Sequence, residues 1–378
     1  MNIFDGHFKL NQDLLRFYGL WPFEKTKFER FRAVCFYILL ISAVIIQLAQ
    51  FVTADLRINV VVKILSDSCL CLIYVINFNI FLFNTKKQML TDPQEIKIVE
   101  HYVYQGKNIT VAVTLLQICM ACTLLMIQLT PDILDFLRPL NESRAHYLLL
   151  LSEYHINEGK LFYYIILYNS VSYNIGISST ISISLIFVLS ALHCCAIFKI
   201  CSYRIQHSVD KKVITCFNKK NEVIKRIIKT VELHKNAQKL FKLLTTSFTL
   251  SFLLIVVVGM CSFVLNLYRL LFAIISMDDF MEFMIATCYI IGHELYLFGT
   301  TFLGQLMVNY ADELFITTYM SLWYKTPVKV QKLFLFVMQI SSKSVVPNLG
   351  GLYVSVMESF TSVMSTAISF MMVIYSIQ

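Results

Sequence analysis

Charged residues, glycine and proline are all scarce in this sequence. Only 15% of its 378 residues are charged, and it contains 11 glycines and 6 prolines. A soluble domain of this length needs more charge to cover its surface, so the composition argues against one. The chain instead has a hydrophobic content of 57% and a mean hydropathy of +0.66. These values predict a protein that lies largely within a lipid bilayer.

The stretch from Met1 to Lys27 contains no long apolar run and no small-residue cleavage site. A cleaved signal peptide is therefore not expected, and the first membrane helix should act as its own insertion signal.

The net charge of +8 does not indicate binding to nucleic acid. The basic residues lie in loops between apolar segments and form no separate basic domain.

The cysteines do not form a recognisable disulfide or metal framework. Nine of the 11 cysteines lie in apolar segments, where thiols usually behave as small hydrophobic groups: Cys35, Cys69, Cys71, Cys119, Cys122, Cys194, Cys195, Cys261 and Cys288. Cys119 and Cys122 have the spacing of a metal or redox pair, but no second pair or nearby histidine supports them. We expect no metal site.

Seven apolar stretches are long enough to cross a bilayer core, which takes about 20 helical residues. They are Ala33–Val52, Ile64–Phe83, Ile109–Leu129, Tyr163–Ile200, Leu243–Ile275, Phe283–Val308 and Val346–Ile377. The fourth has no turn signal or charge that would divide it, so we expect one long helix that extends beyond the bilayer. The sequence thus predicts an all-α membrane protein with seven transmembrane helices.

The positions of the 32 lysines and arginines predict the orientation of these helices. Most lie in the N-terminal tail or in the alternate loops 84–108, 199–242 and 309–345. The opposite loops carry only Arg57, Lys63, Arg138, Arg144 and Lys160, and Arg269 lies inside the fifth span. Basic loops stay in the cytoplasm, so the N-terminus is expected inside and the C-terminus outside the cell. G-protein-coupled receptors have the reverse topology.

The predicted spans divide the chain into four parts. Residues 1–32 form a cytoplasmic tail, 33–308 hold the first six spans, 309–345 form a cytoplasmic segment, and 346–378 form the last span. Apolar residues recur at helical spacing between Asn221 and Leu244, which predicts a cytoplasmic helix. In the 309–345 segment, the apolar run Leu333–Ile340 is too short to span and predicts a packed juxtamembrane helix.

The last span carries a stripe of small hydroxyl residues on one helical face. The stripe runs through Ser355, Ser359, Ser362, Thr366, Ser369 and Ser376, with Val373 on the same face. Such a stripe suits either the lining of a pore or close helix packing, which uses the same residue types. Val373 and Ile377 lie near its end, where a ring of such side chains from several subunits would form a hydrophobic constriction that gates by dewetting.

At this point the sequence resembles the insect odorant receptor family. The resemblance covers the whole chain. It rests on the inverted seven-helix topology, the motif Tyr18-Gly19-Leu20-Trp21-Pro22, and the segment from Ser362 to Gln378, which is similar without gaps to the end of the family's co-receptor. The Thr-Tyr…Gln-Phe pattern usual in the last helix of gustatory receptors is absent.

The resemblance implies a tetrameric, odorant-gated, nonselective cation channel whose last helices line the pore. By position it makes Val373 and Ile377 the gate and places Ser376 and Gln378 at its mouth. The cytoplasmic helices 221–244 and 310–343 would form an anchor. The short loop between the fourth and fifth helices implies an odour-tuned subunit that pairs with the co-receptor, without a G protein, in dendrites of olfactory sensory neurons.

The resemblance also places a pocket for a small volatile ligand in the outer halves of the second, third, fourth and sixth helices. Residues there that suit an aromatic cavity are Ile64, Cys69, Ile73, Tyr74, Cys122, Met126, Tyr164, Tyr168, Asn169, Tyr173, Ile177, Tyr289, His293 and Tyr296. Many of these side chains would equally suit packing between helices, and we expect about half of them to belong to the pocket.

Ionisable residues within the spans need partners or water. Asp67 is expected to reach water or a helix N-terminus. Either His293 or its neighbour Glu294 is expected to pair with Asn169 or Tyr173 or to contact a polar odorant.

Asn141 begins an Asn-Glu-Ser glycosylation sequon in a loop predicted to be external.

The sequence contains no nucleophile–base arrangement and no phosphate-binding loop, so neither an enzyme nor a cofactor is expected. Two rival functions remain, a gustatory-type receptor channel and a secondary transporter. The second is disfavoured because neither internal repeats nor Gly/Pro-broken midplane helices are evident.

Overall fold

The computed structural model describes residues 13, 15–18, 27–53, 58–78, 93–137, 160–208, 220–276, 280–342, 346–349 and 353–376. Its helices are α3 (Lys27–Thr53), α4 (Ile58–Phe78), α5 (Pro93–Leu137), α6 (Lys160–Ser208), α8 (Lys220–Ser276), α9 (Phe280–Met320), α10 (Val328–Ser341) and α11 (Met357–Ser376), with a 3-10 turn, η2 (Trp323–Lys325). The only strands in these ranges are β1 (Asn348–Leu349) and β2 (Tyr353–Val354), which pair antiparallel. The all-α prediction is confirmed.

Five helices of the described part are long and apolar enough to cross a membrane by length and composition alone. They are α3, α5, α6, α8 and α11. The helices α4 and α9, which correspond to the second and sixth predicted spans, carry charged residues in or beside their apolar stretches, such as Asp67 and Glu294. Each of the seven predicted spans therefore overlaps a helix of the described part.

Three helices are much longer than a bilayer is thick. At 1.5 Å per residue, the 45, 49 and 57 residues of α5, α6 and α8 span roughly 70 to 85 Å. The fourth span is therefore one long helix, as predicted. The predicted helix between Asn221 and Leu244 is not separate from the fifth span, because both belong to the continuous helix α8.

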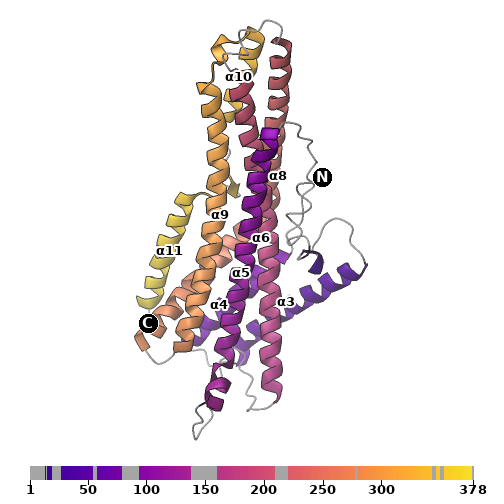
Figure 1. Ribbon diagram of the computed structural model, residues 1–378. Helices are drawn as coiled ribbons and strands as arrows, with labels where there is room; N and C mark the ends of the chain where they lie inside the picture. The colour runs from indigo at the N-terminus through magenta and orange to yellow at the C-terminus, as the bar shows by residue number, and fades with distance from the viewer. Residues whose placement is uncertain are drawn as a thin grey trace.

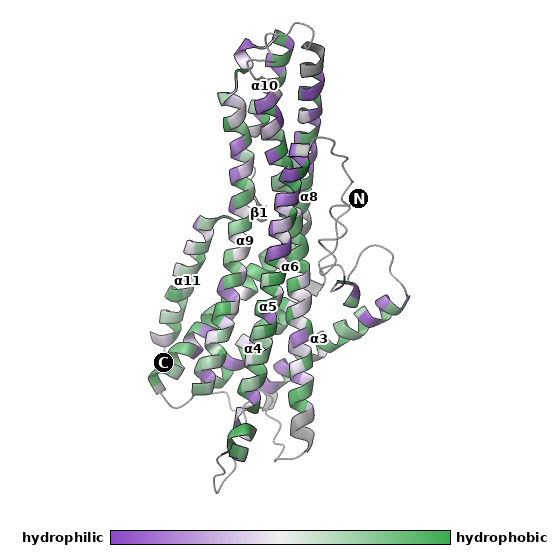
Figure 2. Ribbon diagram, viewed as in Figure 1, coloured by the Kyte–Doolittle hydropathy of each residue, from purple (hydrophilic) through white to green (hydrophobic). Residues whose placement is uncertain are grey.

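The long helices continue into a second bundle, which lies at the top of Figure 1 and includes α10. Hydrophilic segments recur through this upper bundle, whereas α3 and α11 are mostly hydrophobic (Figure 2). Arg204 of α6 holds both carboxylate oxygens of Glu95 on α5, at 2.5 and 2.7 Å. Lys199 of α6 pairs with Glu313 of α9. The Arg204–Glu95 contact is the more buried of the two, and it joins α5 to α6 beyond the apolar spans.

Helix α10 contains the apolar run Leu333–Ile340, so the helical part of that prediction is confirmed. Its buried face, including Val330, Phe334 and Val337, packs at the far end of the upper bundle and not beside the apolar spans (Figure 1). Helix α9 continues without a break to Met320 and carries the chain to that end.

The last helix begins at Met357, not at Val346 as predicted. Two short strands precede it, β1 and β2, in which Asn348 pairs with Val354. Apolar composition suggested a longer helix. However, Pro347 and the Gly350-Gly351 pair are poor helix formers, which explains the later start.

Candidate functional site

A cavity of about 780 Å³ lies among α4, α5, α6, α8, α9 and α11. This volume is within the range of pockets that hold small organic ligands. Its wall is mainly aliphatic and aromatic, with a few polar side chains such as Gln117, Thr180 and His293. A cavity of this kind binds a ligand mainly through shape and burial of apolar surface.

Three tyrosines from three helices meet in the cavity wall. The rings of Tyr74 on α4 and Tyr173 on α6 pack edge to face at 6.0 Å, and Tyr173 stacks with Tyr289 of α9 at 6.3 Å. A side chain at Gly176 would clash with the ring of Tyr74, so this glycine is what lets α6 approach the ring. The tyrosine cluster joins the three helices at the cavity.

Seven of the 14 proposed ligand-binding residues line the cavity: Ile73, Tyr74, Tyr173, Ile177, Tyr289, His293 and Tyr296. The other seven do not. Cys122, Met126 and Tyr164 are exposed, Ile64 and Asn169 are buried away from the cavity, Cys69 is half-buried away from it, and the Tyr168 hydroxyl bonds to that of Ser42.

The sequence did not point to the walls supplied by α8 and α11. Phe252 and Phe263 of α8 and Val363 and Met364 of α11 all line the cavity. On α5 the wall runs from Gln105 to Met120, earlier in the helix than Cys122 and Met126. Composition had marked all these segments as apolar, but the rotation of each helix decides which face borders the cavity.

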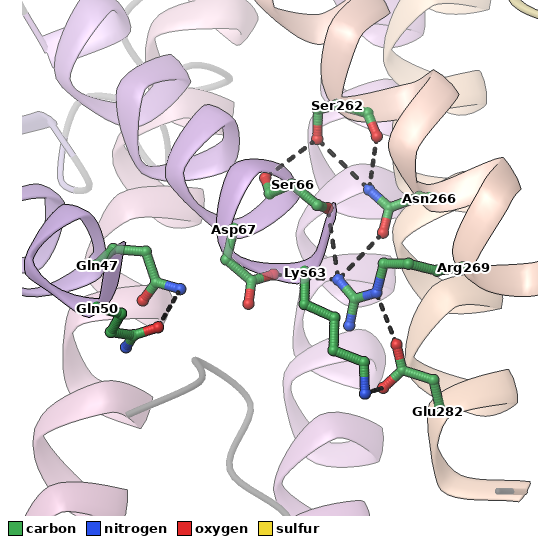
Figure 3. Close-up of polar contacts among 9 residues, drawn as sticks. All are labelled: Gln47, Gln50, Lys63, Ser66, Asp67, Ser262, Asn266, Arg269 and Glu282. Carbon is green, nitrogen blue, oxygen red and sulfur yellow. Dashed lines mark hydrogen bonds and ion pairs between the residues drawn. The ribbon is translucent and has the colours of Figure 1, made fainter. Parts of the chain in front are cut away.

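Charged residues of α4, α8 and α9 form a buried cluster (Figure 3). The guanidinium of Arg269 on α8 donates through Nε to Glu282 of α9 at 2.7 Å and through Nη1 to Asp67 of α4 at 3.2 Å. Lys63 also pairs with Glu282, at 3.0 Å. The side chains of Arg269 and Asp67 are only 4% and 1% exposed. The expectation that Asp67 reaches water or a helix N-terminus was wrong.

This ion cluster, which consists of Lys63, Asp67, Arg269 and Glu282, ties together α4, α8 and α9. Buried charges need partners that replace water, and Asn266 of α8 supplies a further acceptor to Arg269. The Arg269 guanidinium also lies 5.8 Å from the ring centre of Tyr289, within the range of a cation–π contact. Through Tyr289 the ion cluster adjoins the cavity wall.

Helix α11 is attached to the rest of the chain along one face. Ala367 is buried, and Met364, Met371 and Ile374 pack with it against Phe263, Val264 and Ile290. The part of the hydroxyl stripe from Ser362 onward lies on the other face, although Thr366 is half-buried. Ser362, Ser369 and Ser376 are exposed, and Val373 is 53% exposed. At 100° per residue the two faces are about half a turn apart.

The lead-in to α11 also rests directly on α9. The Ser355 hydroxyl donates to the carbonyl of Thr300 at 3.1 Å. A side chain at Gly304 would clash with the Ser355 carbonyl, so this approach requires glycine. Phe298 of α9 packs edge to face with Phe360 of α11 at 5.7 Å. The helix that supplies much of the cavity wall therefore contacts the start of the last helix.

Three proposed site residues are not described. Ile377, Gln378 and the sequon residue Asn141 lie outside the described residues. The hydroxyls of Thr366, Ser369 and Ser376 bond to backbone carbonyls of their own helix. His293 does not pair with Asn169 or Tyr173 as one expectation held, because its Nδ1 bonds to the Tyr289 carbonyl at 2.7 Å.

The seven spans and the apolar cavity among them define a polytopic membrane protein of the small-ligand receptor class. A sequence profile of the 7tm Odorant receptor family matches residues 78–368. The chain therefore belongs to the odorant receptor family, and it is an odorant-binding membrane receptor.

Comparison with solved structures agrees on the fold. The structure is similar to the insect olfactory receptor OR5 from Machilis hrabei in complex with eugenol, with a TM-score of 0.77 and 11% identity over 98% of this chain and 97% of that chain. A second structure of the same receptor matches with a TM-score of 0.73, 11% identity and the same coverage. No curated protein matches this chain. At this identity the likeness concerns the seven-helix fold alone.

Proposed function

We propose that this chain is the odour-tuned subunit of a heteromeric, ligand-gated, nonselective cation channel. It assembles with the odorant receptor co-receptor in the plasma membrane of olfactory sensory neuron dendrites. Its N-terminus is cytoplasmic, its C-terminus is extracellular, and the upper bundle is the cytoplasmic anchor. A small volatile binds in the cavity, permeating cations pass along α11, and no G protein is required.

The orientation of α11 is the observation that supports this proposal most directly. Met364, Ala367 and Met371 hold the helix against its own subunit, whereas Ser362, Ser369 and Ser376 of the hydroxyl stripe are exposed on the other side. Small hydroxyl residues gain little from facing lipid tails. They suit a surface that meets other subunits around a wet pore.

The cavity also borders the proposed pore helix. Val363 and Met364 of α11 belong to the cavity wall, and Met364 lies at the edge of the contact with α8. A ligand that binds better when these side chains are displaced shifts the position of α11. Binding can change gating only through such a difference in affinity between two states.

The gate in this proposal consists of Val373 and Ile377, with Ser376 and Gln378 at the mouth and with Ser362, Thr366 and Ser369 along the pore. The seven cavity residues among the predicted set form the ligand site. The other seven proposed ligand residues are withdrawn from it because they lie away from the cavity wall.

Recording in oocytes with and without the co-receptor tests the channel. We expect a rapid odorant-evoked cation current that needs both chains and persists when G-protein signalling is blocked. Val373→Ala should raise the leak current or shift gating. Ile368→Ala is the matched control, because Ile368 is 50% exposed on α11 but lies off the stripe. Equal effects of the two variants would contradict a gate at Val373.

Cysteine accessibility tests the pore lining itself. Ser369→Cys should react with a charged thiol reagent applied in water, faster in odorant, and the reaction should reduce the current. Ile368→Cys, whose side chain is 50% exposed in the native helix but lies more than a third of a turn from the middle of the stripe, should react slowly. The opposite order would exclude the stripe as a pore. Odorant-free solute uptake without current would instead support a transporter.

A further inference from the structure

The cavity contains polar atoms that no described residue satisfies. His293 Nε2, the Tyr289 hydroxyl and Thr180 Oγ1 are all buried, and none bonds to any part of the chain that the structure describes. All three residues line the cavity. A buried polar atom without a partner is costly, so the chemistry of a ligand that supplies the missing bonds can be read from these atoms.

The hydrogen bond made by Nδ1 of His293 determines whether its Nε2 needs a donor or an acceptor. Its Nδ1 lies 2.7 Å from the backbone carbonyl of Tyr289, one turn earlier in α9. A carbonyl oxygen can only accept, so Nδ1 carries the proton. In the neutral ring, Nε2 is then a bare lone pair, because one nitrogen donates and the other accepts. Nε2 therefore requires a hydrogen-bond donor.

The histidine ring is held in place on both sides. The Nδ1 bond ties it to its own helix, and Phe263 of α8 lies 6.3 Å away between ring centres at an interplanar angle of 36°. Tyr289 is one helical turn before it, so both side chains lie on the same face of α9. The Tyr289 ring is itself positioned by Tyr173 and Arg269. The His293 acceptor and the Tyr289 ring are therefore held in fixed positions on α9.

We propose, on the basis of the odorant-binding function above, that the cavity selects volatiles that carry a hydroxyl group, namely alcohols or phenols. The ligand O–H donates to His293 Nε2, and its oxygen accepts from the hydroxyl of Tyr289 or Thr180. An ether, ketone or ester of the same skeleton accepts from the tyrosine or threonine but leaves Nε2 unsatisfied. A hydrocarbon satisfies none of these atoms.

A site that is built to bond a hydroxyl rejects analogues without one, because its buried groups then lose their partner. One unsatisfied buried acceptor corresponds to a roughly ten- to hundredfold loss of affinity. The aromatic and aliphatic wall contributes equally to all members of a set that shares one skeleton. The hydroxyl preference should therefore appear within a set and be nearly independent of the skeleton.

Ligand binding to the purified full-length chain in lipid nanodiscs tests this inference. Two probe sets are used: 1-octanol, heptyl methyl ether, 2-octanone and octane, and then 4-ethylphenol, 4-ethylanisole and 4-ethylacetophenone. Affinities are obtained from ligand-induced thermal stabilisation. We expect the hydroxyl member of each set to bind about ten- to hundredfold more tightly than the others. An ether or ketone that binds equally well in both sets would overturn the inference.

Three variants connect the preference to the histidine. His293→Phe should remove the preference while retaining affinity for octane, and His293→Gln, whose amide oxygen can accept, should restore part of it. His207→Phe is the matched control, because His207 is exposed at the end of α6 far from the cavity wall. A preference that survives His293→Phe unchanged would assign it to another group and refute the role of Nε2.

The ligand class and the channel function can be refuted independently, because binding tests the first and current tests the second. Hydroxyl-selective binding without any current in the presence of the co-receptor would refute the channel function and leave the ligand class intact. Current evoked equally by ethers and alcohols would refute the ligand class and leave the channel intact. The absence of binding by both complete sets would exclude the cavity as a site for such ligands.

Discussion

Removal of the Arg269 side chain offers a demanding test of the ion cluster. The guanidinium is 4% exposed and bonds to Glu282 at 2.7 Å and to Asp67 at 3.2 Å. In Arg269→Met, Asp67 loses its cationic partner while it stays buried at 1% exposure. Glu282 keeps Lys63 at 3.0 Å. Asp67 is therefore the group whose desolvation is no longer compensated.

Removal of one partner of a buried ion pair destabilises a protein by about 3–5 kcal/mol. By contrast, replacement of both partners with apolar residues is often neutral or stabilising. The double variant Arg269→Met with Asp67→Leu should therefore recover most of the stability that Arg269→Met loses. That recovery distinguishes an unpaired charge from the loss of side-chain packing.

Thermal unfolding of the detergent-purified protein, followed by the loss of the monodisperse peak in size-exclusion chromatography, measures the effect. Lys199→Met is the matched control, because the Lys199–Glu313 pair is 41% and 38% exposed. Pairs this exposed contribute about 0–1 kcal/mol. If Arg269→Met unfolds at the same temperature as Lys199→Met, or if the double variant is no more stable than the single one, the reasoning about the buried charges is refuted.

Three further predictions concern other parts of the chain. Gly304→Ala should destabilise the protein by roughly 1–3 kcal/mol, because its methyl group meets the lead-in to α11, whereas Gly292→Ala, with open space around it, should be neutral or slightly stabilising in the same thermal assay. Burial lowers the pKa of His234, in the upper bundle, from 6.5 to about 4. The unfolded chain therefore takes up the proton first, and stability falls from pH 6.5 toward pH 4 by up to about 1.4 kcal/mol per pH unit. His234→Leu should flatten that part of the thermal stability profile, and an unchanged profile would show that the histidine does not titrate on unfolding. Asn141→Gln should abolish a glycosidase-sensitive shift in electrophoretic mobility of protein from insect cells, and the absence of that shift in the parent chain would contradict an external loop at this position.

Much of the architecture could be predicted from the sequence because hydropathy depends on local composition. A helix that crosses lipid must satisfy its own backbone and present apolar side chains for about 20 residues. This requirement depends only on consecutive residues, so the seven spans and the unbroken α6 could be predicted from the sequence. The start of α11 was misplaced because Val346, Leu349 and Leu352 extend the apolar run of the sequence, whereas Pro347 and Gly350-Gly351 disfavour a helix there.

The site was only partly predictable. The aromatic residues Tyr74, Tyr173, Tyr289 and Tyr296 all line the cavity, because tyrosine in the middle of a span is unusual enough to draw attention. Tyr168 is likewise a tyrosine within an apolar span, but its hydroxyl bonds to that of Ser42 on α3 and it does not line the cavity. Which of two such residues reaches the cavity depends on the rotation and crossing of packed helices, and an isolated span carries no such information.

The sequence by itself determined that the chain is helical, lies in a membrane and carries a small-hydroxyl stripe on its last span. Tertiary structure alone decided that Asp67 meets Arg269, which lies 202 residues further along the chain. It also decided that α11 exposes Ser362, Ser369 and Ser376 of its stripe and that the proton of His293 lies on Nδ1. The physical reason is the range of the forces. Burial in lipid acts on each segment separately, whereas ion pairs, cavities and hydrogen bonds require groups on different helices to come within a few ångströms.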